Sequence, residues 1–234
     1  MILLLAGTTE GRKMADGLHR QGFKVLAATA TVYGKELLSK TYPGQVIAGP
    51  LTLDDLLMII KEKAINRVVD ATHPYATQIT YNAQEACRIT GIAYERVERE
   101  TSGIKADEGI IPAVDTVEAA HIAAKFKGTV FLTTGSSKLE DYTKIIAADR
   151  LVVRILPVRE SLDKCLKLGI LPANIVAMQG PFDYKTNKAL FLRYAAAVII
   201  SKESGPQGGV KEKIDAAASL NIPVILISRP SVLL

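Results

Sequence analysis

Short apolar runs alternate with amphipathic stretches of helical length along almost the whole chain. Runs of aliphatic and β-branched residues predict strands, and apolar positions repeated at helical spacing predict helices. In the first half, strands are expected at residues 2–5, 24–29, 45–48, 67–70 and 93–97. Helices are expected there at residues 10–21, 53–63 and 78–90.

The second half of the chain repeats the alternation. Strands are expected at residues 129–132, 151–155, 174–178, 197–200 and 223–227. Helices are expected at residues 117–126, 139–147, 161–168, 187–195 and 211–220. Alternating strands and helices indicate an α/β protein with mostly parallel sheets and helices on both faces.

Between the halves lies ERETSGIKADEGIIP, residues 98–112, which is charged and has no clear period. We therefore predict an N-terminal Rossmann-like, dinucleotide-binding lobe at residues 1–98, a linker at 99–112 and a C-terminal α/β lobe at 113–234. A cleft for cofactor and substrate is expected between the two Rossmann-like lobes. One continuous doubly wound sheet is the competing layout, and periodicity does not separate the two.

Composition narrows the class of protein. The chain has 234 residues, of which 48% are hydrophobic, enough for a sizeable core. Its net charge is +5, but the 29 Lys and Arg residues are dispersed and Trp is absent, which disfavours nucleic acid and favours an acidic small molecule. No apolar run approaches the roughly 20 residues of a membrane span, and the N-terminus lacks a signal-peptide pattern.

The positions of the cysteines and histidines disfavour a metal site. Cys87 and Cys165 are isolated, which predicts reduced thiols in a cytoplasmic protein. His19, His73 and His121 are too far apart in sequence for a local metal motif. No metal ligand is therefore expected.

Chemically distinctive residues follow the predicted strands, at the edge where parallel sheets bind ligands. The loops of the first half are AGTTEGR (6–12), ATATVYG (28–34) and DATHPYA (70–76). Those of the second half are TTGSSK (133–138), RILP (154–157), MQGPF (178–182), SKESGPQGG (201–209) and SRP (228–230). Their shared position favours a ligand site over simple turns.

The first loop is typical of an anion site, because a strand, a glycine turn and a helix start present free backbone N–H groups. It is neither GxGxxG nor a Walker loop. A threonine hydroxyl there can cap the helix or bind phosphate, and an arginine can reach phosphate. The predicted cofactor-binding residues are Gly7, Thr8, Thr9, Glu10, Gly11 and Arg12.

The end of the second strand bears on the choice of cofactor. NAD-binding folds usually carry an acid there, which holds the ribose hydroxyls. This chain has Thr29 and Thr31 instead, whose hydroxyls, with Arg12 nearby, would accept a 2′-phosphate. If a dinucleotide binds, NADPH is favoured over NADH.

DATHPYA contains the best catalytic candidate. His73 comes three residues after Asp70, directly before Pro74, and histidine exchanges protons near neutral pH. A satisfied polar turn, capped by the Asp70 side chain, explains the same residues equally well. Tyr75 and Lys202 are the other candidate proton donors.

Taken together, the loops resemble the precorrin-6A reductase family of cobalamin biosynthesis, including its cobalt-precorrin form. The matching pieces are LLLAGTTEGR, DATHPYA, LTTGSSKL, RILP, MQGPF, KESGPQGGVKEKIDAAASLNIPVILISRP and the ERE segment at 98–100. The resemblance implies an oxidoreductase that uses NADPH to reduce one double bond of a tetrapyrrole carrying many carboxylates. It assigns to substrate binding Asp70, Thr72, Ser136, Lys138, Arg154, Gln179, Ser204, Gly205 and Arg229.

Two other classes of protein fit the fold. A methyltransferase that uses S-adenosylmethionine would also have a glycine loop after its first strand, but an acid would be expected after the second. A non-catalytic nucleotide-binding module would leave DATHPYA and the loops of the second half without a role.

Overall fold

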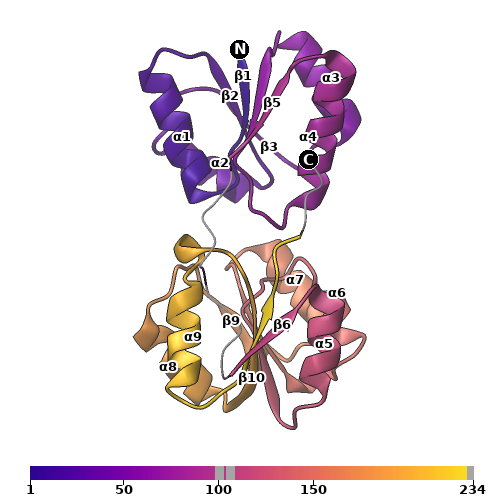
Figure 1. The fold of residues 1–234 in the computed structure, drawn as a ribbon, viewed down its shortest axis with the longest axis vertical. Helices are drawn as coiled ribbons and strands as arrows, with labels where there is room; N and C mark the ends of the chain where they lie inside the picture. The colour runs from indigo at the N-terminus through magenta and orange to yellow at the C-terminus, as the bar shows by residue number, and fades with distance from the viewer. Residues whose placement is uncertain (98–102, 104–108, 231–234) are drawn as a thin grey trace. The chain divides into compact units, whose positions relative to one another are not determined.

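The computed structural model describes residues 1–97, 103 and 109–230. Their packing divides them into two compact units: the first contains residues up to Val97, and the second contains Gly103 and residues 109–230 (Figure 1). Each unit has its own sheet, so the alternative of one continuous sheet is wrong. The ERE segment and most of the predicted linker lie outside the described residues.

The N-terminal unit is built on a five-stranded parallel sheet of order β3-β2-β1-β4-β5. The strands are β1 (Ile2–Leu5), β2 (Val25–Thr29), β3 (Val46–Ala48), β4 (Arg67–Asp70) and β5 (Ala93–Arg96). The helices are α1 (Thr9–Arg20), α2 (Val32–Ser39), α3 (Leu53–Glu62) and α4 (Thr77–Thr90). Helix α2 was not predicted, because residues 28–34 were interpreted as a loop.

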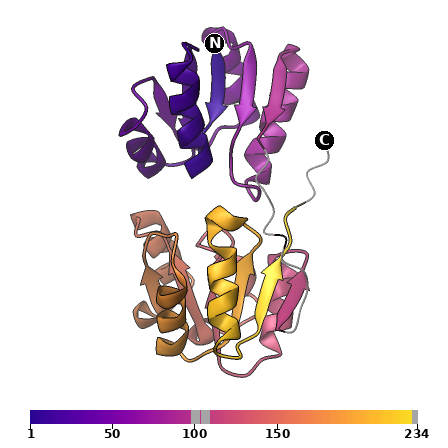
Figure 2. The ribbon, with the colours of Figure 1, turned by 60° about the vertical axis from the view of Figure 1, so that its left-hand side comes forward.

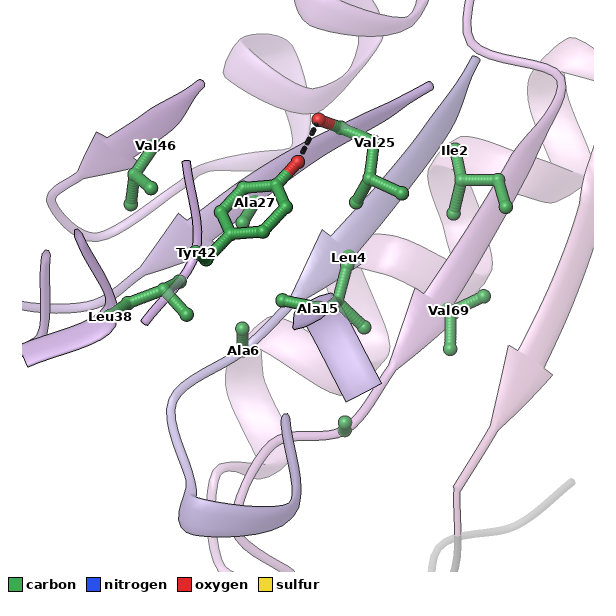
Figure 3. Close-up of a cluster of buried hydrophobic side chains, with 11 residues drawn as sticks. Ile2, Leu4, Ala6, Ala15, Val25, Ala27, Leu38, Tyr42, Val46 and Val69 are labelled. Carbon is green, nitrogen blue, oxygen red and sulfur yellow. Dashed lines mark hydrogen bonds between the residues drawn. The ribbon is translucent and has the colours of Figure 1, made fainter. Parts of the chain in front are cut away.

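Strand β1 shows why the apolar run forms the centre of this sheet. Alternate side chains of a strand face opposite sides. Ile2 and Leu4 pack in one core with residues of α1 and α2, and Leu3 packs in the other with residues of α3 and α4. In the first core, Tyr42 donates a hydrogen bond to the carbonyl of Val25 at 2.5 Å (Figure 3). Helices therefore cover both faces, as predicted.

The C-terminal unit is built on a six-stranded parallel sheet of order β6-β11-β10-β7-β8-β9 (Figure 2). The strands are β6 (Ile110–Ala113), β7 (Thr129–Leu132), β8 (Leu151–Ile155), β9 (Ile175–Ala177), β10 (Ala196–Lys202) and β11 (Val224–Ile227). The α-helices are α5 (Thr116–Ala124), α6 (Leu139–Thr143), α7 (Arg159–Lys167), α8 (Tyr184–Arg193) and α9 (Val210–Ala218). Short 3₁₀ turns are η1 (Ala148–Arg150), η2 (Pro172–Asn174) and η3 (Pro206–Gly208).

Strand β6 corrects the end of the predicted linker. The linker was expected to run to Pro112, but Ile110–Ala113 pairs in parallel with β11. The proline is tolerated because β6 is the edge strand of its sheet. Its weak local pattern is completed by a partner more than a hundred residues away.

The two units share one topology. Strands β7 to β11 lie in the order β9-β8-β7-β10-β11, which repeats β3-β2-β1-β4-β5 strand for strand. In each sheet the direction of the connections reverses beside the first strand of this series, between β1 and β4 and between β7 and β10. Ligands of open parallel sheets bind at such switch points, beyond the carboxyl ends of the strands. The loops there are 6–8 with 71–76, and 133–138 with 203–209.

Candidate functional site

The turn after β1 begins helix α1 with a side-chain cap. Thr8 has extended backbone angles, and its hydroxyl accepts a hydrogen bond from the Gly11 N–H at 3.1 Å. The same hydroxyl donates to the carbonyl of Ala71 at 2.9 Å, which ties together the two loops of the switch point. Thr8 is buried and its hydroxyl serves the fold, so its predicted contact with a phosphate stays a prediction.

The two glycines of this turn differ in what a side chain would meet. A Cβ on Gly7 would have nothing within 4 Å, and Gly7 is exposed. A Cβ on Gly11 would lie 2.8 Å from the Cα of Ala6. Gly11 is therefore buried and required for close packing of α1 against the turn, and its predicted contact with the cofactor stays a prediction. Gly7 leaves space on the outer side of the turn.

The remaining residues of the turn also divide into buried and accessible side chains. The carboxylate oxygens of Glu10 are buried. Thr9 is exposed, and its hydroxyl accepts a hydrogen bond from the Arg12 guanidinium at 2.9 Å. Gly7, Thr9 and Arg12 thus form the part of the predicted cofactor site that is accessible, together with the backbone N–H groups at the start of α1.

Helix α2 changes the interpretation of the threonines after β2. Thr29 is buried and donates to the carbonyl of Thr31 at 3.0 Å, so its hydroxyl is engaged in the fold and its predicted contact with a cofactor stays a prediction. Thr31 is exposed and caps α2 by accepting from the Gly34 N–H at 3.0 Å. The end of β2 carries no acid and leads into a helix start.

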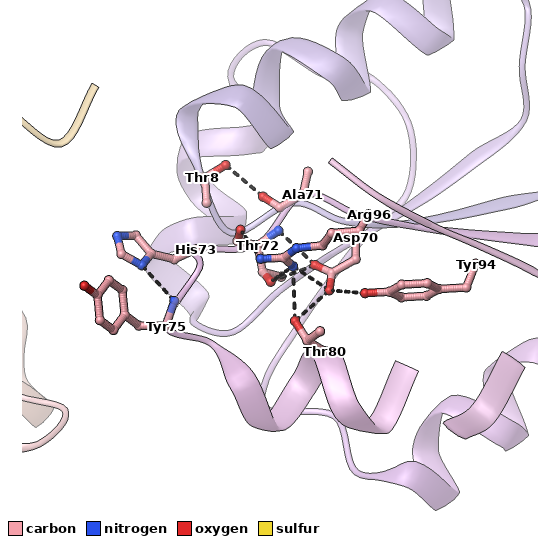
Figure 4. A network of polar contacts seen from close by, with 9 residues as sticks. All are labelled: Thr8, Asp70, Ala71, Thr72, His73, Tyr75, Thr80, Tyr94 and Arg96. Carbon is pink, nitrogen blue, oxygen red and sulfur yellow. Dashed lines mark hydrogen bonds and ion pairs between the residues drawn. The ribbon is translucent and has the colours of Figure 1, made fainter. Parts of the chain in front are cut away.

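A buried carboxylate lies under the loop after β4 (Figure 4). Asp70 has 0% exposure. One oxygen accepts from the Thr72 N–H at 3.0 Å and from the Thr72 hydroxyl at 2.7 Å. The other accepts from Thr80 at 2.7 Å and Tyr94 at 3.0 Å, and pairs with Arg96 at 2.6 Å. This network anchors the loop to α4 and β5.

The network also determines the charge of Asp70. Burial by itself raises the pKa of Asp70, but hydrogen bonds from Thr72 and Thr80 and the charge of Arg96 outweigh it and hold the pKa below its ordinary value. Burial, with the Asp70 charge adding to it, raises the pKa of Tyr94. Asp70 is therefore held as a carboxylate, and its polar contacts with Thr72, Thr80, Tyr94 and Arg96 all come from donors.

This arrangement gives Asp70 and Thr72 a role in the fold. Both side chains are buried and bonded within the unit, where they position the loop; their predicted contacts with a substrate stay predictions. Sequence reasoning missed Tyr94 and Arg96. The available signal was register, because Arg96 ends β5 directly beside Asp70 at the end of β4.

His73 and Tyr75 are partly exposed on the loop that this network holds. Nδ1 of His73 accepts a hydrogen bond from the Tyr75 N–H at 3.3 Å, and the two rings lie 5.5 Å apart (Figure 4). A neutral ring with Nδ1 as acceptor carries its hydrogen on Nε2. His73 is thus arranged to donate a hydrogen bond from Nε2; an imidazolium would direct its Nδ1–H at the Tyr75 N–H.

At the switch point of the C-terminal unit, the predicted residues include two lysines close enough to interact. Lys202 is the last residue of β10, not part of the following loop as predicted. Burial lowers the pKa of Lys202, and the charge of Lys138 lowers it further. Lys138 immediately precedes α6. Ser136, in the loop before it, shares a hydrogen bond of 2.9 Å with Ser161 of α7.

The other predicted residues of this unit are dispersed between surface and interior. Gln179 is exposed after β9. Ser204 and Gly205 are buried, and Gly205 has φ +76° and donates its N–H to the Glu203 carboxylate at 3.0 Å. Arg229 pairs with the same Glu203 carboxylate at 3.5 Å. Arg154 is only 5% exposed, so it does not lie on the accessible edge as expected.

A metal site, a reactive thiol and a membrane-spanning helix each require particular features of the described residues. No group of three potential metal-ligating side chains occurs in the part of the chain that the structure describes. Cys87 and Cys165 are free and buried, and burial raises the pKa of the Cys87 thiol to about 11. None of the described helices is long and apolar enough to cross a membrane.

Comparison with known proteins covers the whole chain. The sequence model of the family described as precorrin-6x reductase CbiJ/CobK matches residues 1–233. A cobalt-precorrin-6A reductase of Methanothermobacter thermautotrophicus is 38% identical over 99% of this chain and 77% of its own length. One from Priestia megaterium is also 38% identical, over 99% of this chain and 91% of its own.

A solved structure is similar as well. CobK precorrin-6A reductase superposes with a TM-score of 0.79 at 29% identity and covers 100% of this chain and 89% of its own. Family match, relatives and structural neighbour agree with the resemblance of the loop motifs. The chain therefore belongs to the precorrin-6x reductase (CbiJ/CobK) family.

Proposed function

We propose that this protein uses NADPH to reduce one double bond of the precorrin-6A macrocycle, or of its cobalt-containing form, in cobalamin biosynthesis. Similarity to reductases named for these substrates supports the reaction. The observation that carries the proposal is the exposed Gly7 turn at the switch point of the N-terminal unit, in a chain that matches this family from end to end.

The turn fits a dinucleotide phosphate. Gly7 offers open space to an approaching group, α1 begins directly after it, and Arg12 adds a guanidinium on the exposed side. Backbone N–H groups at a helix start and an arginine are the donors that phosphate needs. When bound, a reduced nicotinamide would supply the hydride. The residues that would hold the cofactor are Gly7, Thr9 and Arg12.

The end of β2 supports NADPH over NADH. No carboxylate follows the strand, and the exposed Thr31 leads into the first turn of α2. A carboxylate there would repel a 2′-phosphate, whereas a hydroxyl beside a helix start accepts one. Thr31 is therefore the proposed contact of the 2′-phosphate, and the Arg12 guanidinium is the proposed cationic donor beside it.

Three side chains remain as acids for the proton that accompanies hydride addition. His73 is proposed to hold the macrocycle by a hydrogen bond from Nε2, since Nδ1 is engaged by the Tyr75 N–H. Lys202 is proposed as the proton donor, because burial and the charge of Lys138 lower its pKa and make it a stronger acid than an ordinary lysine. Tyr75 is the third candidate.

The experiment is a reduction assay with purified protein, precorrin-6A and cobalt-precorrin-6A in parallel, following NADPH oxidation. We expect turnover with at least one of the two macrocycles. A thermal-shift screen of NADPH, NADH and S-adenosylmethionine accompanies it, because a specific ligand stabilises the native state. Stabilisation by S-adenosylmethionine alone would identify a methyltransferase, and NADPH binding without turnover of either macrocycle would favour a nucleotide-binding module.

A further inference from the structure

Two buried cations lie in the layer between the C-terminal sheet and helices α8 and α9. Arg154 of β8 is 5% exposed and Lys213 of α9 is 8% exposed. Arg154 donates to the Asn187 side-chain oxygen at 2.8 Å and stacks 4.1 Å over the ring of Phe182. Lys213 donates to the carbonyl of Gly208 at 2.8 Å. Sequence reasoning did not indicate Lys213.

Short contacts connect the surroundings of the two cations. The Asn187 side-chain N–H donates to the carbonyl of Phe182 at 3.2 Å. The same carbonyl lies 3.6 Å from the position of a Cβ on Gly209, the residue next to the one that Lys213 holds. The loop before α8 therefore touches the loop before α9, and the cations lie beneath these two loops.

Neither Arg154 nor Lys213 forms an ion pair with any described residue. Burial and the charge of Arg154 lower the pKa of Lys213 to about 8, although Glu212 and Glu203 oppose the shift. Glu203 pairs with Arg229 instead. Buried charges are normally paired, so two buried cations without a direct ion pair are unfavourable.

A buried hydroxyl points into the same layer. Val152 and Ile199 belong to the core that contains Phe191 of α8. Arg154 and Ser201 lie two residues further along their strands and so face the same side. Ser201 has 0% exposure, and its hydroxyl has no hydrogen-bond partner among the described residues. A buried donor without an acceptor is rare.

We infer that Arg154 and Lys213, with Ser201, form a buried site for one anionic group, a carboxylate or a phosphate. Such a group would neutralise the two cations and accept a hydrogen bond from the hydroxyl. Gly208 packs closely against Ser204 above this layer, because a Cβ on Gly208 would lie 1.9 Å from the Ser204 hydroxyl. The identity of the natural ligand rests on the proposed function: a carboxylate would come from the macrocycle and a phosphate from the cofactor.

The test uses the full chain and two simple probes, inorganic phosphate and succinate, titrated at constant ionic strength. Lys213→Met is compared with Lys211→Met, which removes the same charge from the same helix. Lys211 is the matched control because its side chain is 73% exposed and paired with Asp215. Loss of a charge-assisted hydrogen bond predicts about a 10- to 100-fold higher Kd for at least one probe in Lys213→Met, and none in Lys211→Met.

A purely structural role for Lys213 gives the opposite results. It predicts that Lys213→Met melts at a lower temperature and binds both probes like the parent. The proposed site predicts an unchanged or higher melting temperature without probe, since repulsion from Arg154 is removed. If Lys213→Met does not fold, Ser201→Ala replaces it; unchanged probe affinity in that variant would overturn the proposal.

The source of the anion is distinguished in the folded variant. A raised KM for the macrocycle with unchanged NADPH affinity assigns the site to a substrate carboxylate, and weakened NADPH binding assigns it to a cofactor phosphate. Probe binding that depends on Lys213 in a parent protein without reductase activity would retain the anion site and reject the proposed function. A parent protein that has reductase activity but binds neither probe through Lys213 would retain the proposed function and reject the anion site.

Discussion

The two units have the same strand order but opposite buried charge. In the N-terminal unit, the carboxylate of Asp70 receives donors from Thr72, Thr80, Tyr94 and Arg96. In the C-terminal unit, Arg154 and Lys213 are buried with only amide and carbonyl acceptors. The shared topology therefore determines where a site can form in each unit. Whether the buried charged group is ion-paired distinguishes the two units. The paired group holds a loop, and the unpaired ones are left for a ligand.

The largest expected effect is on stability, when the ion-paired Asp70 is replaced. Asp70→Ala leaves Arg96 buried without its anion, which should lower the free energy of unfolding by about 3–5 kcal/mol. Arg154→Met should change it by about 1 kcal/mol or less, because an unpaired cation is replaced by an apolar chain. Urea unfolding measures both. Equal losses in the two variants would break the comparison.

The second effect concerns the loop that Asp70 positions. His73→Ala removes the proposed hydrogen bond from Nε2 to the macrocycle, so KM should rise about 10- to 100-fold with kcat nearly unchanged. His121→Ala, an exposed histidine of α5, is the control. A fall in kcat of about 10²–10⁴-fold with constant KM would instead make His73 the proton donor.

The third effect separates the two glycines of the first turn. Gly7→Val should weaken NADPH binding about tenfold or more and leave stability unchanged, because the side chain meets only the approaching phosphate. Gly11→Ala should instead destabilise the protein by about 1–3 kcal/mol through overpacking against Ala6. Isothermal titration and thermal unfolding measure the two. Full NADPH affinity in Gly7→Val would make the turn purely structural.

A smaller effect is expected on the choice of cofactor. Arg12→Gln should reduce the preference for NADPH over NADH by about tenfold, the contribution of one charge-assisted hydrogen bond. Lys13→Gln, an exposed neighbour on α1, should leave the ratio of the two dissociation constants unchanged. A parent protein that binds NADH as tightly as NADPH would overturn the proposed 2′-phosphate contact.

The smallest effect is on pH dependence. The pKa of Lys213 is about 8 in the folded unit and ordinarily 10.5. Between these values the unfolded chain binds a proton that the folded chain does not, so this group's contribution to stability rises with pH and is lost as pH falls towards 8. Lys213→Met should flatten that rise in urea unfolding relative to Lys211→Met. Identical slopes would show that Lys213 titrates normally.

Much of the fold is encoded in local pattern. Residues 2–5, 67–70, 129–132 and 151–155 were predicted as strands with the bounds that the structure gives, because an apolar run between turn residues is a local signal. The edge of the sheet that carries the candidate site follows from sequence too, since parallel strands direct their loops to one edge. Gly7, Thr9 and Arg12 lie in one continuous segment there and stay the predicted cofactor contacts.

Tertiary structure decided what depends on distant partners. The division into two sheets rests on which strands pair with which, and strand β6 rests on its pairing with β11. No local period encodes either. Thr8, Asp70 and Thr72 look like ligand contacts in sequence, but Ala71, Tyr94 and Arg96 use their polar atoms. Lys213 looks like an ordinary helix lysine until the fold buries it beside Arg154. The sequence specifies which polar groups could bind a ligand. The tertiary structure determines which of them already form hydrogen bonds or ion pairs within the protein.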